Sequence, residues 1–265
     1  MDISQDFIRR QITDIGIEHD RSMAAERATL DLLVNGDGAR LSDDHEGDAV
    51  LRGLNRRKFL MFGGAGVLSS AVFAACKGAS GSPVSASATT AGPTTTSLSG
   101  LANDLTILRT AASVEALAVM VYETAIKSGL VRTAAITAMA KLFQSQHVQH
   151  GELFNRSAQS AGGTAFTDPN PVLLAQVVQP RLAALKTEMD VVNLAYDLEH
   201  LASATYQNDV GLFHNPKYNV TVASVGGAEA RHVALLAVIG GKSATGTPDN
   251  GFQADADAVK PGTGV

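Results

Sequence analysis

The residues of this chain best suited to chemistry are a glutamate and a histidine three positions apart, Glu229 and His232. Carboxylate and imidazole together are suitable ligands for iron, manganese or zinc. Residues three apart share one face of a helix, and that face otherwise carries the apolar Val222, Val225 and Leu236. Because a buried carboxylate is costly unless it is paired or binds a metal, the pair predicts either a metal site or a fully hydrogen-bonded polar network.

Three further segments combine an apolar helical face with an inward polar side chain. Glu115 lies seven residues from both Leu108 and Tyr122 in a predicted apolar stripe. Glu199 interrupts the inward face of another predicted helix, and His147 interrupts that of a third. Three glutamates and two histidines are therefore expected at core positions of four helices. Something must compensate these buried polar groups.

The segments around these residues resemble helices of the ferritin-like family. The resemblance is carried by Glu115 in VEALAVMVY, by Glu199 in LEHLASATY and by the Glu229-Ala-Arg-His232 motif. In that family, one glutamate from each of two helices and a Glu-x-x-His motif from each of two others converge on two metal ions. The resemblance implies the metal ligands Glu115, His147, Glu199, Glu229 and His232. It also implies a ferritin-like antiparallel four-helix bundle with a long crossover between helices two and three.

The second helix departs from the family motif. It reads Gln144-Ser-Gln-His147, so a neutral glutamine stands at the position of a missing carboxylate. Three inward carboxylates offset one divalent cation but leave two undercompensated in a buried site. This predicts at most one tightly bound ion, iron or manganese in preference to zinc, or none. His150 could add a ligand after a helix adjustment, although a histidine one turn further on is expected to face solvent or to bond locally.

The apolar periodicity places the helices between residues 101 and 241. They are expected at about 103–128, 133–160, 181–209 and 220–239. The first connection is short enough to force an antiparallel hairpin, whereas the second is long enough to cross the end of a bundle. Tryptophan is absent and aromatic residues make up only 5% of the chain. Together with the abundant alanine, this favours an all-α fold over strands.

Composition divides the rest of the chain into four segments. Residues 1–54 form a polar, partly helical segment with no visible chemistry, and residues 55–76 form a signal-like segment. Residues 77–100 are a linker of mainly Ser, Thr, Gly, Pro and Ala, and residues 242–265 are expected to be a disordered tail. In the signal-like segment, Arg56 and Arg57 precede an uncharged run that ends at Cys76. A basic start, an apolar stretch and small residues are the parts of a secretory signal, and the paired arginines resemble the twin-arginine type. The apolar run of about 17 residues is short for a bilayer span, which favours a cleaved signal.

Cys76 is the only cysteine, so the chain has no intramolecular disulfide and no multi-cysteine metal site. The run from Phe73 to Cys76 resembles a lipobox, although Phe73 replaces the usual aliphatic residue. Lipid attached to Cys76 would anchor the protein, and the linker that follows would act as a tether. Because signals usually begin near the start of a chain, the residues ahead of Arg56 imply a true start further downstream or a preceding cytoplasmic segment.

Charge and composition narrow the function. The formal net charge is −5 and the basic residues are scattered, which argues against nucleic-acid binding. The expected partners are the twin-arginine export machinery and, through Cys76, the membrane at the cell envelope, with the oligomeric state open. Two functions remain: an envelope-tethered ferritin-like metalloprotein, at most a metal-dependent oxidoreductase, or a metal-free helical lipoprotein with a binding or structural role. Gln144 favours the second.

Overall fold

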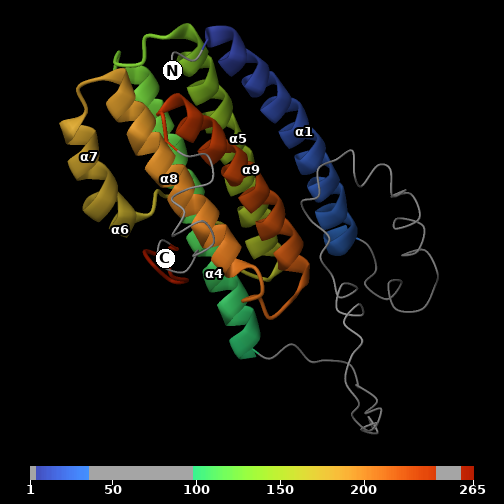
Figure 1. Cartoon of the computed structure of the whole chain (residues 1–265). Helices are drawn as coiled ribbons and strands as arrows, with labels where there is room; N and C mark the ends of the chain where they lie inside the picture. Colours follow the sequence, from blue (N-terminus) through green and yellow to red (C-terminus); the bar gives the residue numbers. More distant parts are fainter. Residues whose placement is uncertain (1–3, 36–97, 243–257) are drawn as a thin grey trace, which may run out of the picture. The chain divides into compact units, whose positions relative to one another are not determined.

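The computed structural model describes residues 4–35, 98–242 and 258–265. These residues form a bundle of helices, and no strand occurs among them (Figure 1). The prediction of an all-α bundle is therefore confirmed. The predicted signal, lipidation site and linker, with Arg56, Arg57 and Cys76, lie outside the described residues.

Two long helices, α4 (Leu98–Lys127) and α5 (Ala134–Ser160), form the first hairpin of the bundle. Gly129 follows α4 with a φ of 71°, a left-handed conformation that favours glycine and ends the helix. Thr133 stands at the N-cap of α5, but its hydroxyl donates to Oε1 of Glu188 at 2.6 Å. Glu188 also accepts hydrogen bonds from two backbone N–H groups of this turn, at 2.6 and 2.7 Å. The carboxylate of Glu188 thus ties the turn to the start of the third bundle helix.

The third bundle helix is shorter than predicted. The periodicity predicted one helix over residues 181–209, but the chain forms α7 (Gln179–Ala184), breaks, and begins α8 (Glu188–Asp209). A capping box causes the new start. Thr187 Oγ1 accepts a hydrogen bond from the Asp190 N–H at 3.1 Å, and the Asp190 carboxylate accepts one from the Thr187 N–H at 2.8 Å. These two bonds satisfy backbone groups that a continuous helix would have paired internally.

The connection between α5 and α8 is the predicted long crossover. It contains α6 (Pro171–Leu173), a π-helical turn (Leu174–Val178) and α7 (Figure 1). Asn170 is fully buried and fixes the connection against the middle of α4. Its backbone N–H donates to the Ser113 carbonyl at 3.0 Å, and its side-chain amide donates to Ser113 Oγ at 2.8 Å.

Helix α9 (Lys217–Ile239) follows α8 after a short loop and completes the bundle. It packs on α8 and α5, while α8 also packs on α4. Val222, Val225 and Leu236 form its buried face, as predicted. Since α8 begins at the α4–α5 turn, α5 and α8 run in one direction and α4 and α9 in the other, which brings one face of each helix to a common centre.

The C-terminal tail was predicted to be disordered, but its last residues, 258–265, lie against the bundle. The backbone N–H of Val259 donates to Thr205 Oγ1 at 2.9 Å, and that of Gly262 donates to Thr110 Oγ1 at 2.8 Å. The Val259 side chain is only 6% exposed. Hydroxyl groups on α8 and α4 therefore order a segment whose composition alone predicted disorder.

An additional helix, α1 (Gln5–Asn35), packs along α5 and α9 (Figure 1). Ile8, Ile15 and Met23 are at most 7% exposed. Their spacing of seven and eight residues forms one stripe along the helix. The helix predicted in the polar N-terminal segment is therefore present, and it buries its apolar side against the bundle.

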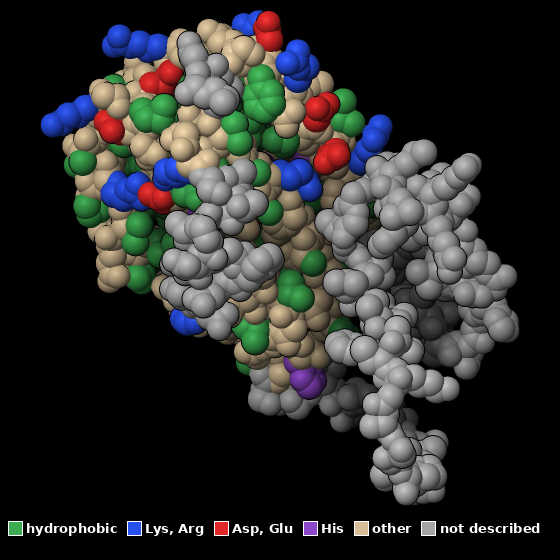
Figure 2. Space-filling view, in the orientation of Figure 1, with side chains coloured by type: hydrophobic (Ala, Val, Ile, Leu, Met, Phe, Trp, Pro, Cys, Tyr) green, Lys and Arg blue, Asp and Glu red, His purple; other side chains and the backbone are tan. Residues whose placement is uncertain are grey.

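The surface of the bundle carries charges of both signs. Figure 2 shows basic and acidic side chains interspersed over the described residues visible in that view. Asp197, for example, lies 2.7 Å from Arg181 and 3.5 Å from Lys242. Exposed pairs of this kind contribute little to stability, so the buried core must supply most of it.

Candidate metal centre

The polar side chains predicted to point inward meet in the centre of the bundle. They come from all four bundle helices, and each is at most 1% exposed: Glu115 on α4, His147 on α5, Glu199 on α8, and Glu229 and His232 on α9. All five ligands implied by the sequence are thus brought together. With His150 they form two groups of four, in each of which the potential ligand atoms lie within 4.8 Å of one another.

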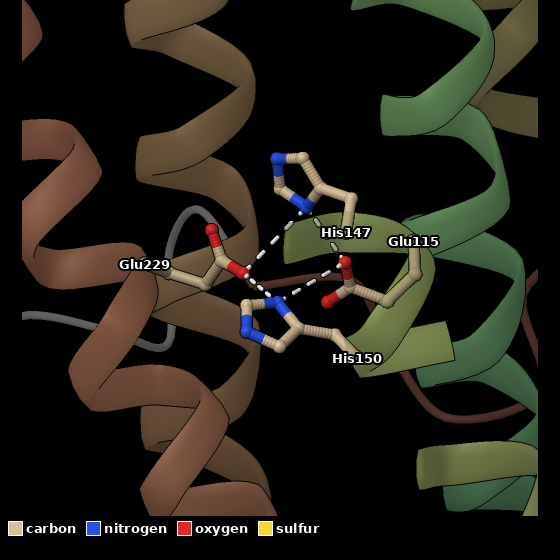
Figure 3. A group of neighbouring side chains, drawn as sticks. All are labelled: Glu115, His147, His150 and Glu229. Atoms are coloured by element: carbon tan, nitrogen blue, oxygen red, sulfur yellow. Dashed lines mark hydrogen bonds and ion pairs between the residues drawn. The ribbon is translucent and has the colours of Figure 1, made fainter. Parts of the chain in front are cut away.

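The first group consists of Glu115, His147, His150 and Glu229 (Figure 3). Nδ1 of His147 lies 2.7 Å from Oε2 of Glu115 and 3.6 Å from Oε1 of Glu229. Nδ1 of His150 lies 2.7 Å from Oε1 of Glu229 and 3.6 Å from Oε2 of Glu115. Two imidazoles and two carboxylates therefore direct donor atoms at one point between α4, α5 and α9.

The second group shares His147 and Glu229 with the first and adds Glu199 and His232. Nε2 of His147 lies 3.1 Å from Oε1 of Glu199. Nδ1 of His232 lies 3.2 Å from Oε2 of Glu199 and 3.0 Å from Oε2 of Glu229. His147 thus presents one ring nitrogen to Glu115 and the other to Glu199.

The motif on α5 lies one turn further along than predicted. Gln144 is only half-buried, its amide donates to the backbone carbonyl of Val119 at 3.4 Å, and it belongs to neither group. His150, expected to face solvent or to bond locally, is instead fully buried in the first group. The motif is therefore His147-x-x-His150, with a histidine where the pair on α9 has its glutamate. The rotation of α5 decides this, because it turns position 150 toward α9 and position 144 toward the α4 backbone.

Two buried tyrosines hold the carboxylates. The hydroxyl of Tyr122 donates to Glu199, and that of Tyr206 donates to Glu115. Burial and the neighbouring carboxylates raise the pKa of both tyrosines well above its ordinary value, so both hydroxyls remain protonated donors. Each bond orients one carboxylate toward the centre.

His232 is held in one orientation. Its Nε2 donates to Oε1 of the buried Gln146 at 2.6 Å, and its ring stacks on Phe143 with the centroids 3.9 Å apart. Burial lowers the pKa of His232, which keeps the ring neutral. With the proton on Nε2, the lone pair of Nδ1 faces the carboxylates, as a metal ligand requires.

The charges of the protein groups nearly balance on their own. Burial lowers the pKa of His147, but Glu199, Glu229 and Glu115 outweigh this and raise it well above its usual value. Burial raises the pKa of Glu115 and of Glu199, but the charge of His147 outweighs this and lowers both. Burial raises the pKa of Glu229 well above its usual value, and the charges of Glu199 and Glu115 add to this effect. The centre thus places the positive charge of His147 between the carboxylates of Glu115 and Glu199.

Two atoms of the first group have no hydrogen-bond partner. Nδ1 of His150 and Oε1 of Glu229 are both buried and form an ion pair at 2.7 Å, but neither atom makes a hydrogen bond. Leaving a buried polar atom unsatisfied costs about 1–3 kcal/mol. Both atoms can donate electron pairs, and a divalent cation bound between them would satisfy both. The donor set therefore fits a metal ion.

Helix α1 adds a residue that the sequence analysis missed. His19 is 1% exposed, and its Nε2 lies 3.1 Å from Nε2 of His150. Burial lowers the pKa of His19 to about 3, so its ring is neutral. The available signal was its position four residues after Ile15 and four before Met23, within the apolar stripe of α1.

An apolar pocket reaches the centre from the side of α4 and α8. Aliphatic side chains such as Leu117 and Leu198 form most of its wall. Its polar lining consists of Glu115, Tyr122, His147 and Glu199.

The sequence matches the model of a family described as a ferritin-like domain over residues 103–242. This range is more than half of the 265 residues, and it contains all six candidate ligands but not α1. No curated protein and no solved structure matches the chain.

Proposed function

Because this chain belongs to the ferritin-like domain family, we propose that it binds one divalent metal ion in the centre of its bundle. The observation that carries the proposal is a pair of buried atoms that make no hydrogen bond, Nδ1 of His150 and Oε1 of Glu229, which lie 2.7 Å apart. Glu115 and His147 complete a set of four donors around that point. A cation bound there would be held by all four groups, including the two atoms that make no hydrogen bond.

The charge of the ligands sets the number of ions. The carboxylates of Glu115 and Glu229 neutralise one divalent cation. A second ion would have to share Glu229 and His147 and would add only Glu199 as a new carboxylate. Two ions would then leave one positive charge uncompensated in a buried site, which is costly. We therefore expect one ion per chain.

The donor types favour iron or zinc. Carboxylates alone suit manganese, whereas imidazole suits iron and zinc. His150 raises the number of imidazoles in the first group to two, which shifts the expectation away from manganese. An iron ion held there would supply one-electron redox chemistry. The apolar pocket between α4 and α8 supports access for a small apolar oxidant, while Tyr122 and Tyr206 keep the carboxylates oriented.

The test is metal loading of the full chain. The protein is stripped with a chelator, exposed separately to Fe(II) without oxygen, Zn(II) and Mn(II), desalted and analysed for bound metal and for Tm. We expect one ion per chain, and at a hundredfold excess over Kd a stabilisation of about 2.7 kcal/mol, or roughly 5–10 °C. Glu229→Gln should abolish both effects. Glu152→Gln, at an exposed position on α5, is the matched control and should bind normally.

The alternative function is a metal-free helical protein with a binding or structural role. The observation that favours it is the charge balance between His147 and the carboxylates, which lets the centre exist as a polar network. Absence of bound metal, together with an unchanged or higher Tm for Glu229→Gln, would establish this alternative and end the metal proposal.

We also propose, from the sequence, that residues 55–76 direct export and that a lipid on Cys76 tethers the protein to the cell envelope. Replacing both Arg56 and Arg57 by lysine should stop delivery of a reporter that works only when exported folded. Cys76→Ser should release the protein from membranes. Undiminished export or membrane association in these variants would contradict the respective assignment.

A further inference from the structure

We infer that α1 is a fifth helix of the metal centre and that His19 is a positioning residue for the ligand His150. This inference deepens the proposed function and rests on the metal site described above. The family match begins at residue 103, so the contribution of α1 does not follow from family membership. It follows from contacts that α1 makes with α5 and α9.

The contact between His19 and His150 has the geometry of a metal-binding histidine and an outer residue that is hydrogen-bonded to it. Nε2 of His19 lies 3.1 Å from Nε2 of His150, and the ring centroids are 5.1 Å apart. The other nitrogen of His150, Nδ1, faces Glu229 at 2.7 Å and Glu115 at 3.6 Å. His150 can therefore offer Nδ1 to the metal while its Nε2–H donates to His19. Such an outer hydrogen bond fixes the tautomer and ring orientation of a metal-binding histidine.

Polar contacts seat α1 on both neighbouring helices. The carboxylate of Glu26 is 5% exposed and accepts a hydrogen bond from the hydroxyl of Thr221 on α9 at 2.6 Å. The guanidinium of Arg27 donates to Oε1 of Gln149 on α5 at 2.9 Å. These hydrogen bonds to α9 and α5 hold α1 in the position that places His19 beside His150.

Packing alone does not explain a histidine at position 19. Its buried neighbours Ile15 and Met23 are apolar, and the buried Glu26 is hydrogen-bonded to Thr221. Nδ1 of His19 is buried without a hydrogen-bond partner and lies 3.6 Å from the exposed Asp20 carboxylate. Burying a partly unsatisfied imidazole is costly, whereas an isoleucine or leucine would carry no such cost. The bond to His150 is what the histidine supplies.

The proposed signal cleavage bears on the contact between His19 and His150. His19 lies ahead of the proposed signal at 55–76, and the bundle lies behind it. Cleavage before Cys76 would therefore cut the chain between His19 and the bundle, so that only the contacts of α1 with α5 and α9 would keep His19 beside His150. If α1 is then lost, Nε2 of His150 loses this partner, and the metal centre of the processed chain differs from that of the unprocessed one.

The experiment compares three variants of the full chain, with Zn(II) and Co(II) alone as probes. His19→Phe keeps a ring but removes the acceptor, and His19→Gln keeps an acceptor. Ile15→Ala weakens the packing of α1 without touching His150. We expect His19→Phe to weaken Zn(II) affinity about 10-fold and to shift the Co(II) absorption bands, while His19→Gln stays within about threefold of the native chain.

Each other result overturns the inference. Zn(II) affinity of His19→Phe within about twofold of native would do so, and so would an equal loss in Ile15→Ala, because α1 would then act only as a cover. In the metal-free chain, His19→Phe should melt about 3 °C below His19→Gln, since the His150 donor has lost its acceptor. Equal Tm values would refute the hydrogen bond. A native chain that binds no Zn(II), Fe(II) or Mn(II) refutes the proposed function itself, which separates the two failures.

Discussion

Replacing Asp209 by asparagine should remove a pH dependence from the stability of the bundle. Asp209 is the last residue of α8, is 1% exposed, and its Oδ1 has no hydrogen-bond partner. Burial raises the pKa of its carboxyl from 3.8 to about 7. The negative end of the α8 dipole also disfavours an anion at this position. Asp209 is therefore protonated in the folded protein at pH 5 and ionised at pH 8.

The sign of the effect follows from the two pKa values. A carboxyl whose pKa is higher in the folded state stabilises that state at low pH, and this stability is lost as pH rises through the folded pKa. With a pKa of 3.8 unfolded and about 7 folded, the full loss approaches about 4 kcal/mol above pH 7. About 3 kcal/mol of this is lost between pH 5 and pH 8.

The assay is urea denaturation of the metal-free native and Asp209→Asn chains at both pH values. The difference in unfolding free energy between variant and native should grow in favour of the variant by about 3 kcal/mol from pH 5 to pH 8. Asp168→Asn, at an exposed position, is the control and should show no such growth. A difference for Asp209→Asn that is the same at both pH values would refute the argument from burial.

Four further variants test the remaining contacts. Tyr206→Phe should lower the unfolding free energy by about 1–3 kcal/mol, because the buried Glu115 loses its hydrogen bond; superimposable urea curves would contradict this. Thr187→Ala should cost about 1 kcal/mol through loss of the capping box of α8, and an unchanged Tm would show that the break in the chain has another cause. Gln144→Glu should not raise Zn(II) affinity in equilibrium dialysis, because this side chain lies outside both ligand groups. His147→Glu should instead admit a second ion, because it restores a Glu-x-x-His motif and four carboxylates neutralise two divalent cations. A higher Zn(II) affinity of the Gln144→Glu chain would mean that α5 is rotated so that residue 144 faces the metal centre.

Local periodicity was enough to predict the helices and their inward carboxylates. Each of Glu115, Glu199 and Glu229 interrupts a long apolar stripe, and a stripe with the helical period defines an inner face whichever helix packs against it. The end of α5 at Ser160 was also predicted. The break before α8 was missed, because apolar spacing continues across it while the capping signal from Thr187 is short.

The local sequence pattern could not decide whether Gln144 or His150 on α5 faces the centre of the bundle. Gln144 and His150 each lie three residues from His147, which places them about 60° to either side of it on the helix. Periodicity treats these positions alike, and family resemblance favoured Gln144. Contact with α9 rotates α5 so that His150 meets Glu229 at 2.7 Å.

The sequence by itself determined that Glu115, Glu199 and Glu229 face inward, because side-chain period and hydrophobicity are properties of a single helix. Only the tertiary structure decided which of them meet. His19 and His150 are 131 positions apart and belong to helices with separate apolar stripes. No local signal relates two such stripes, because their pairing depends on how α1, α5 and α9 fill the space between them.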